Sequence, residues 1–139
     1  SAFATNDIYK REPIGLENNL RNIIAIATER NIKLVTLTFK SKLDNLHRLF
    51  PAIKDNSVLR SNVMKRQTFA VEKTNQTIIN LSKELGIPVI PYHEFEPSKP
   101  DSWADTVHLF DDGLYDKAKY IGDWLITLNL IPIDVKHGD

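Results

Sequence analysis

The chain has 139 residues, which is enough for one domain of ordinary size and too few for two. Hydrophobic residues make up 42% and charged residues 26%, a balance typical of a globular protein rather than a disordered one. Eighteen basic and eighteen acidic side chains cancel, so neither a nucleic acid nor an anionic membrane surface is expected as the main partner. No apolar run reaches the roughly 18 residues of a membrane span. We therefore expect a single domain over residues 1–139.

The sequence contains no cysteine. This excludes disulfides, thiolate metal sites and cysteine nucleophiles. The absence of cysteine suits the cytosol and the periplasm alike, so it leaves the compartment open.

The first elements in chain order are a strand, a helix and a second strand. Residues 1–5 (SAFAT) resemble the interior of a strand. Apolar residues recur at helical spacing between Leu16 and Ala27 and predict an amphipathic helix over about 15–30. Residues 32–39 (IKLVTLTF) are rich in β-branched residues and nearly all apolar, as in a strand buried on both faces.

Two helices and a third strand follow. Leucines spaced by three residues suggest a short helix that ends before Pro51, because a proline restricts the residue that precedes it. A long helix is expected from about Val63 to Leu85, with Gly86 in the position of a left-handed C-terminal cap. Residues 87–92 (IPVIPY) predict a short strand, whose two prolines favour the edge of a sheet.

A basic stretch runs from Lys54 to Lys73 and overlaps the start of the long helix. Asp55 and Glu72 interrupt it. Such a mixed stretch favours a solvated helix face over a phosphate-binding groove.

The chain closes with a loop over residues 93–109 and a last helix. Asp111 or Asp112 could cap this helix, which carries apolar residues at alternating spacings of four and three as far as Leu128. Alternating strands and helices predict an α/β fold with about three parallel strands and flanking helices. Three such strands leave one edge unpaired, so we expect an incomplete sheet that another segment or a second copy closes.

The loop before the last helix carries the strongest chemical signal, Asp105 and His108. In open parallel sheets, ligands bind outside the carboxyl ends of the strands, and this loop follows the third strand. A carboxylate that holds one imidazole nitrogen makes the ring an effective general base, and a spacing of three residues lets the two side chains meet. The alternatives are a local turn capped by Asp105 and a purely structural His108.

A second polar group, Asn6 with Asp7, follows the first strand. An amide there can donate a hydrogen bond to a developing oxyanion. The same pair is also a common way to open a loop, because both side chains bond to local backbone.

Two further alternatives concern the third loop. His93 and Glu94 could join Asp105 and His108 around a zinc ion, but no recognised ligand spacing is present, and no metal or other cofactor is expected. Aromatic side chains flank the presumed site: these are Tyr92 and Trp103. They could line an acyl or sugar pocket, or Trp103 could simply pack the loop onto the sheet.

Taken in order, these blocks resemble the C-terminal part of the SGNH (GDSL-type) hydrolase family. Residues 4–7 (ATND) resemble the family's middle Gly-x-Asn-Asp block, with Ala4 in place of the glycine. Residues 104–109 (ADTVHL), followed by Gly113 and a helix, closely resemble its final Asp-x-x-His block. Asn75 resembles the asparagine that often opens the family's penultimate helix.

The resemblance implies a flavodoxin-like three-layer parallel sheet and a Ser–His–Asp ester hydrolase for a small-molecule or carbohydrate ester. In that family's scheme His108 would be the general base, Asp105 its orienting acid and Asn6 an oxyanion-hole donor. No serine here lies in a Gly-Asp-Ser motif, and Ser41, near the end of the second strand, lacks a sharp turn.

The chain is therefore expected to be inactive alone, with its nucleophile supplied by a missing N-terminal segment or by another chain. The alternative is a non-catalytic module that dimerises through its exposed strand and binds a ligand at the former site.

Overall fold

The computed structural model describes residues 14–132, and the following account is confined to them. Helices dominate this part of the chain, the longest having 29 residues. The helices and strands, in order, are α2 (Ile14–Glu29), β1 (Thr36–Leu37), α3 (Leu46–Leu49), α4 (Ser57–Leu85), β2 (Val89–Ile90) and α5 (Asp111–Thr127). Short 3-10 turns cover Leu43–Asn45, Pro51–Ile53, Tyr92–Glu94 and Pro100–Ser102.

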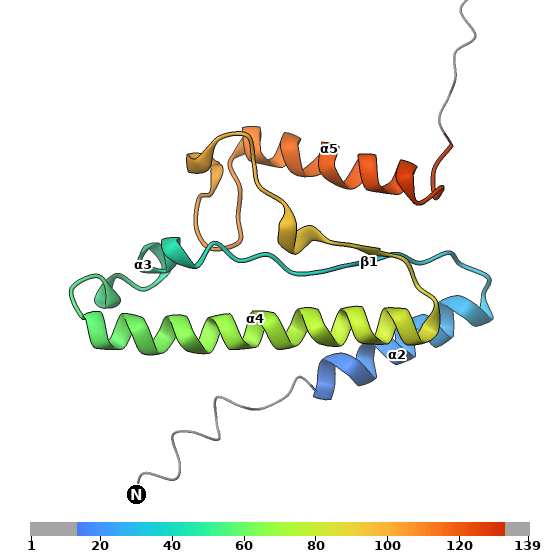
Figure 1. Cartoon of the computed structure of the whole chain (residues 1–139), viewed down its shortest axis with the longest axis horizontal. Coiled ribbons are helices and arrows are strands. Elements are labelled where there is room, and N and C mark those ends of the chain that lie inside the picture. Colours follow the sequence, from blue (N-terminus) through green and yellow to red (C-terminus); the bar gives the residue numbers. More distant parts are fainter. Residues whose placement is uncertain (1–13, 133–139) are drawn as a thin grey trace, which may run out of the picture.

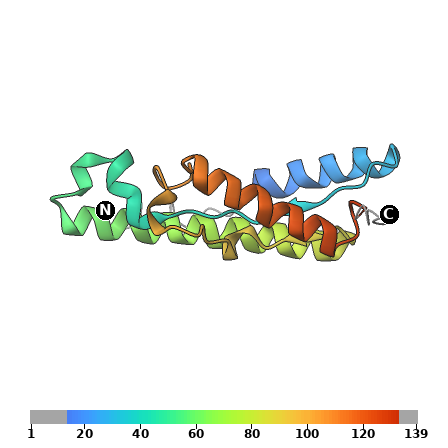
Figure 2. The same cartoon turned by 90° about the horizontal axis from the view of Figure 1, so that it is seen from above.

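The two strands run between helices. α4 lies along one side of them and α5 along the other (Figure 1). α2 packs against the C-terminal half of α4 (Figure 2). Arg21 of α2 forms an ion pair of 2.9 Å with Glu84 of α4. The N-terminal half of α4 extends beyond α2 and contacts the turns around α3 (Figure 1).

The expected α/β fold with a flavodoxin-like three-layer parallel sheet is wrong, because the structure is mostly helical and its sheet has two strands. Thr36 pairs with Val89 and Leu37 with Ile90, in parallel. The strand expected over residues 1–5 lies outside the described residues. The strands predicted over residues 32–39 and 87–92 are present, but each has only two residues.

Prolines explain part of this shortening. Pro88 and Pro91 bracket β2, and neither has a backbone N–H to donate to a ladder. The carbonyl of Pro88 still accepts from the N–H of Thr36 at 2.9 Å, after which the ladder closes with Thr38 donating to Ile90 at 3.1 Å.

The helices agree better with the sequence. α2 and α3 lie where expected, and Gly86 forms the left-handed C-cap of α4 with a φ of 69°. α4 begins earlier than predicted, because Asn56 accepts the N–H of Leu59 at 2.9 Å and caps the helix there. The cap expected from Asp111 or Asp112 is wrong: Phe110 occupies that position without a side-chain bond. Both aspartates lie in the first turn instead, where negative charge favours a helix start.

An aromatic cluster forms the core between the strands, the loop over residues 93–109 and α5. Trp103 is 1% exposed, and the rings of Tyr92 and Phe95 stack at 5.2 Å. Tyr120 of α5 contacts this cluster and donates its hydroxyl to the carbonyl of Pro91 at 2.9 Å. Trp103 and Tyr92 therefore belong to a buried cluster that packs the loop against Leu37 of β1 and Tyr120 of α5. No helix within residues 14–132 is long and apolar enough to cross a membrane.

Candidate active site

Asp105 and His108 form a hydrogen-bonded pair on the loop before α5. Oδ2 of Asp105 lies 2.6 Å from Nδ1 of His108. The other carboxylate oxygen, Oδ1, accepts the backbone N–H groups of Val107 and His108, each at 2.8 Å. An ionised carboxylate only accepts hydrogen bonds, so Nδ1 of the neutral ring carries the proton. Nε2 is then left as the proton acceptor.

The surroundings of the two side chains differ in a way that suits a base and its partner. The side chain of Asp105 is 19% exposed, whereas that of His108 is 76% exposed. The backbone N–H of His108, followed by that of Val107 and by the His108 ring, lowers the pKa of Asp105 to about 2. The carboxylate is thus ionised at neutral pH and held in place, while the imidazole reaches solvent.

The loop that carries the pair is held closed at its base. Trp103 and Leu109 form an antiparallel bridge, and the N–H of Ala104 donates to the carbonyl of His108 at 2.8 Å. Gly113, in the first turn of α5, packs directly on this base. A Cβ atom at position 113 would lie 2.9 Å from Cδ2 of Leu109. The glycine after the Asp-x-x-His block therefore permits the close approach of helix and loop.

Two residues that contact this loop were not predicted from the sequence. Arg48 donates to the carbonyls of Trp103 and Ala104, and Asn45 donates to the carbonyl of Asp105. Both follow β1, Asn45 in a 3-10 turn and Arg48 in α3, and so lie beyond the carboxyl end of a strand, where ligands bind in open parallel sheets. Their place after a strand was the only feature of the sequence that pointed to them, because the atoms they bond to are backbone carbonyls.

Asn75 holds the chain at the end of β1. Its Oδ1 accepts the N–H of Phe39 at 2.5 Å, and its Nδ2 donates to the carbonyl of the same residue at 2.8 Å. Asn75 is buried within α4 and lies well past the start of that helix, whereas the family asparagine that it resembles often opens one. The Asn75 amide thus bonds to both backbone groups of Phe39, as a neighbouring strand would.

The structure does not bring the remaining candidates together. Asn6 lies outside the described residues. His93 pairs with Thr38, whose Oγ1 lies 2.7 Å from its Nδ1, and its Nε2 lies 3.7 Å from the carboxylate of Glu94. Across residues 14–132 no three His, Asp or Glu side chains gather as metal ligands do. The zinc alternative therefore finds no support in the described geometry.

No serine hydroxyl within residues 14–132 is hydrogen-bonded to His108, whose side-chain partner there is Asp105. Ser82 bonds to Thr36, and Ser98 bonds to Asp116. The other serines of this part of the chain are Ser41, Ser57, Ser61 and Ser102.

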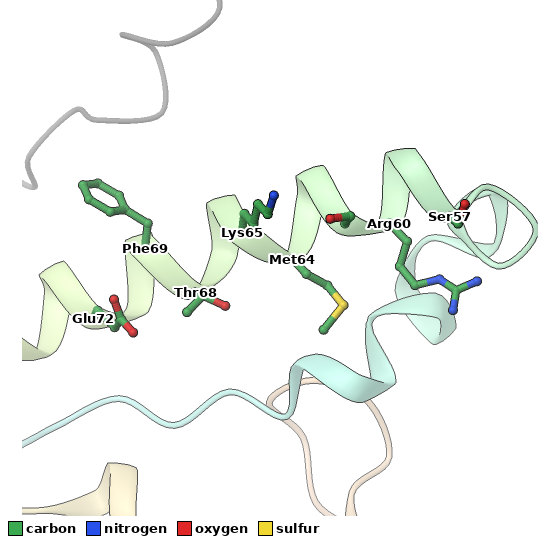
Figure 3. Close-up of a pocket in the computed structure, with 8 residues that line it drawn as sticks. Ser57, Arg60, Met64, Lys65, Thr68, Phe69 and Glu72 are labelled. Carbon is green, nitrogen blue, oxygen red and sulfur yellow. The ribbon is translucent and has the colours of Figure 1, made fainter.

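An open depression on α4 does contain serines, but it lacks histidine (Figure 3). Ser57, Met64 and Phe69 line it along the first half of the helix. Arg60 and Lys65, from the basic stretch, are exposed beside them, as expected for a solvated face. Because Asp105 and His108 are not among the lining residues, this depression is separate from the candidate site.

Comparisons with known proteins do not assign the chain to a family. It matches no family model, and no curated protein or solved structure matches it. A function proposed for the chain therefore depends on the geometry of its own residues.

Proposed function

We propose that Asp105 and His108 are the orienting acid and the general base of an ester hydrolase with a Ser–His–Asp mechanism, of the SGNH type that the sequence resembles. One observation supports the proposal most: a carboxylate fixed by two backbone N–H groups holds Nδ1 of an exposed imidazole. This arrangement leaves Nε2 available to take a proton from a nucleophile.

The proposed reaction has two halves. Nε2 of His108 takes the proton of a serine hydroxyl while the serine oxygen attacks the ester carbonyl. Asp105 stabilises the imidazolium that forms, which then gives its proton to the departing alcohol. In the second half Nε2 activates a water molecule that hydrolyses the acyl-serine bond and restores the free hydroxyl. The proposed substrate is a small-molecule or carbohydrate ester.

The nucleophilic serine belongs, in this proposal, to polypeptide outside residues 14–132. No serine hydroxyl within that range is bonded to His108. Asn6 keeps its proposed role as an oxyanion donor, because a side-chain amide can hydrogen-bond the developing negative charge.

A fluorophosphonate probe tests the proposal on the protein at its natural length. We expect covalent labelling of a serine outside residues 14–132, slowed at least about 100-fold by His108→Gln. The matched control is His47→Gln, because His47 is also exposed but its Nδ1 bonds to the backbone carbonyl of Asp44 and not to a carboxylate. It should label at the wild-type rate.

Two results would contradict the role of the pair, and a third would contradict the proposed location of the serine. One is a protein that the probe does not label, which would favour the non-catalytic binding module instead. The other is labelling of His108→Gln at the wild-type rate, which would show that the serine does not need this base. Labelling of a serine within residues 14–132 would overturn the assignment of the nucleophile.

A further inference from the structure

The segment between β1 and α4 holds the backbone that carries Asp105. Four consecutive carbonyls, from Trp103 to Thr106, each accept a hydrogen bond from residues 42–48. Nη1 of Arg48 donates to Trp103 at 2.6 Å and to Ala104 at 3.0 Å, Nδ2 of Asn45 to Asp105 at 3.3 Å, and the N–H of Lys42 to Thr106 at 2.7 Å.

This segment is itself anchored. Leu46 and Ile53 are each 3% exposed, and the turns that contain Asn45 and Ile53 contact α4. Asn45 and Arg48 are three residues apart, so on a helical turn their side chains point the same way. The planar guanidinium of Arg48 can serve two successive carbonyls from one nitrogen, which a flexible ammonium group does less well.

We propose that Asn45 and Arg48 are positioning residues for the Asp105–His108 pair. They act on the backbone and do not contact the reacting atoms. By holding the carbonyls of residues 103–106, they fix the direction in which the Asp105 side chain leaves the chain. They also fix the turn that aims two N–H groups at Oδ1 of Asp105. The catalytic consequence of this inference rests on the proposed function, whereas the structural one does not.

Loss of Arg48 would leave the carbonyl of Ala104 to find water as its partner, and that of Trp103 with the longer bond from Asn45 at 3.5 Å. The peptide planes before Asp105 could then rotate, and the N–H groups of Val107 and His108 would no longer converge on one oxygen. The carboxylate would lose donors to its ionised form, which raises the pKa of Asp105 toward its ordinary value. The imidazole would lose its fixed orientation at the same time.

The test compares Arg48→Met with Arg60→Met in the protein at its natural length. Arg60 is a matched control, because its guanidinium also bonds two backbone carbonyls, those of Ile53 and Lys54, away from the pair. We expect Arg48→Met to move the carbon-13 NMR titration of the Asp105 carboxyl to higher pH. We also expect about a 10- to 100-fold loss of kcat with little change in KM, as for a misplaced catalytic group. Arg60→Met should leave the titration and both kinetic constants unchanged.

The two readouts separate this inference from the proposed function. An unchanged Asp105 titration in Arg48→Met overturns the inference, whatever the kinetics. A shifted titration in a protein without esterase activity supports the positioning role and contradicts the proposed function. If circular dichroism shows that Arg48→Met does not fold, Asn45→Ser removes a single donor and its titration is judged in the same way.

Discussion

Asp105 divides its two carboxylate oxygens between the backbone and the ring of His108. Oδ1 accepts the N–H groups of Val107 and His108, and Oδ2 holds the imidazole. All of these donors lie within three residues of the aspartate. One tight turn therefore builds the whole arrangement, and the spacing of three is what places the backbone donors and the ring donor on the same carboxylate.

The lowered pKa of Asp105 predicts how this turn responds to acid. The folded-state pKa of about 2 lies below the ordinary value, so ionised Asp105 stabilises the folded loop above about pH 4 and this contribution is lost as the pH falls toward 2. We expect the Asp105 carboxyl to titrate near pH 2 by carbon-13 NMR. The amides of Val107 and His108 should lose their protection from exchange over the same range. Titration near pH 4 would contradict the geometry.

The sequence could predict the pair but not the residues that hold it. Asp105 and His108 are close along the chain, so their spacing carries the contact. Arg48 and Asn45 act on backbone carbonyls 55 to 60 residues away, and a backbone carbonyl has no residue type that a pattern could reveal. Neither residue could therefore be assigned a partner before the structure placed the two loops together.

At the scale of elements, the start of α5 depends on close packing against the loop. Gly113 is buried, and a Cβ there would lie 2.9 Å from Cδ2 of Leu109 and 3.0 Å from Cβ of Ser102. Gly122, later in the same helix, has open space where its Cβ would be. The same substitution at the two sites should thus have opposite effects.

Gly113→Ala is expected to destabilise the protein by about 1–3 kcal/mol, because the added methyl group overpacks the base of the loop. Gly122→Ala is expected to stabilise it by up to about 1 kcal/mol, because alanine favours a helix interior more than glycine does. Urea unfolding of both variants measures this difference. A Gly113→Ala protein as stable as Gly122→Ala would contradict the packing.

The sequence predicted the helices better than the strands. Helical spacing and the cap at Gly86 are local features, and they located α2 and the end of α4. Apolar runs over residues 32–39 and 87–92 indicate burial, but a strand also needs partners with N–H groups to donate. Prolines within the second run limit the ladder to two residue pairs, a restriction that its apolar pattern does not show.

At the scale of the whole molecule, the sheet is narrow and α2 leaves apolar side chains uncovered. Within residues 14–132 the two strands have no third neighbour. Ile23 and Ile26 on α2 are 55% and 51% exposed, although Ile24 and Ala27 beside them are buried against the protein. The α/β prediction counted residues 1–5, which lie outside the described residues, as one of three strands, and the two strands that are described have only two residues each. The length of a strand depends on its partners elsewhere in the chain, so local patterns could not give the fold class.

These exposed isoleucines predict self-association, in which a second copy covers them. Light scattering should show a mass that rises toward that of a dimer as concentration increases. Ile23→Glu with Ile26→Glu should keep the protein monomeric to higher concentration, whereas Asn19→Glu, on an already polar exposed position of α2, should not. A wild-type protein that stays monomeric throughout would contradict this prediction.

The kinetics of acyl-ester hydrolysis by the protein at its natural length test the central claim most directly. We expect His108→Gln and Asp105→Asn each to lower kcat by about 10³-fold or more, and the double variant to lose no more than the worse single one, because the two residues act as a unit. A His108→Gln enzyme that retains kcat within about tenfold of wild type, or losses that multiply in the double variant, would contradict a general-base pair at this site.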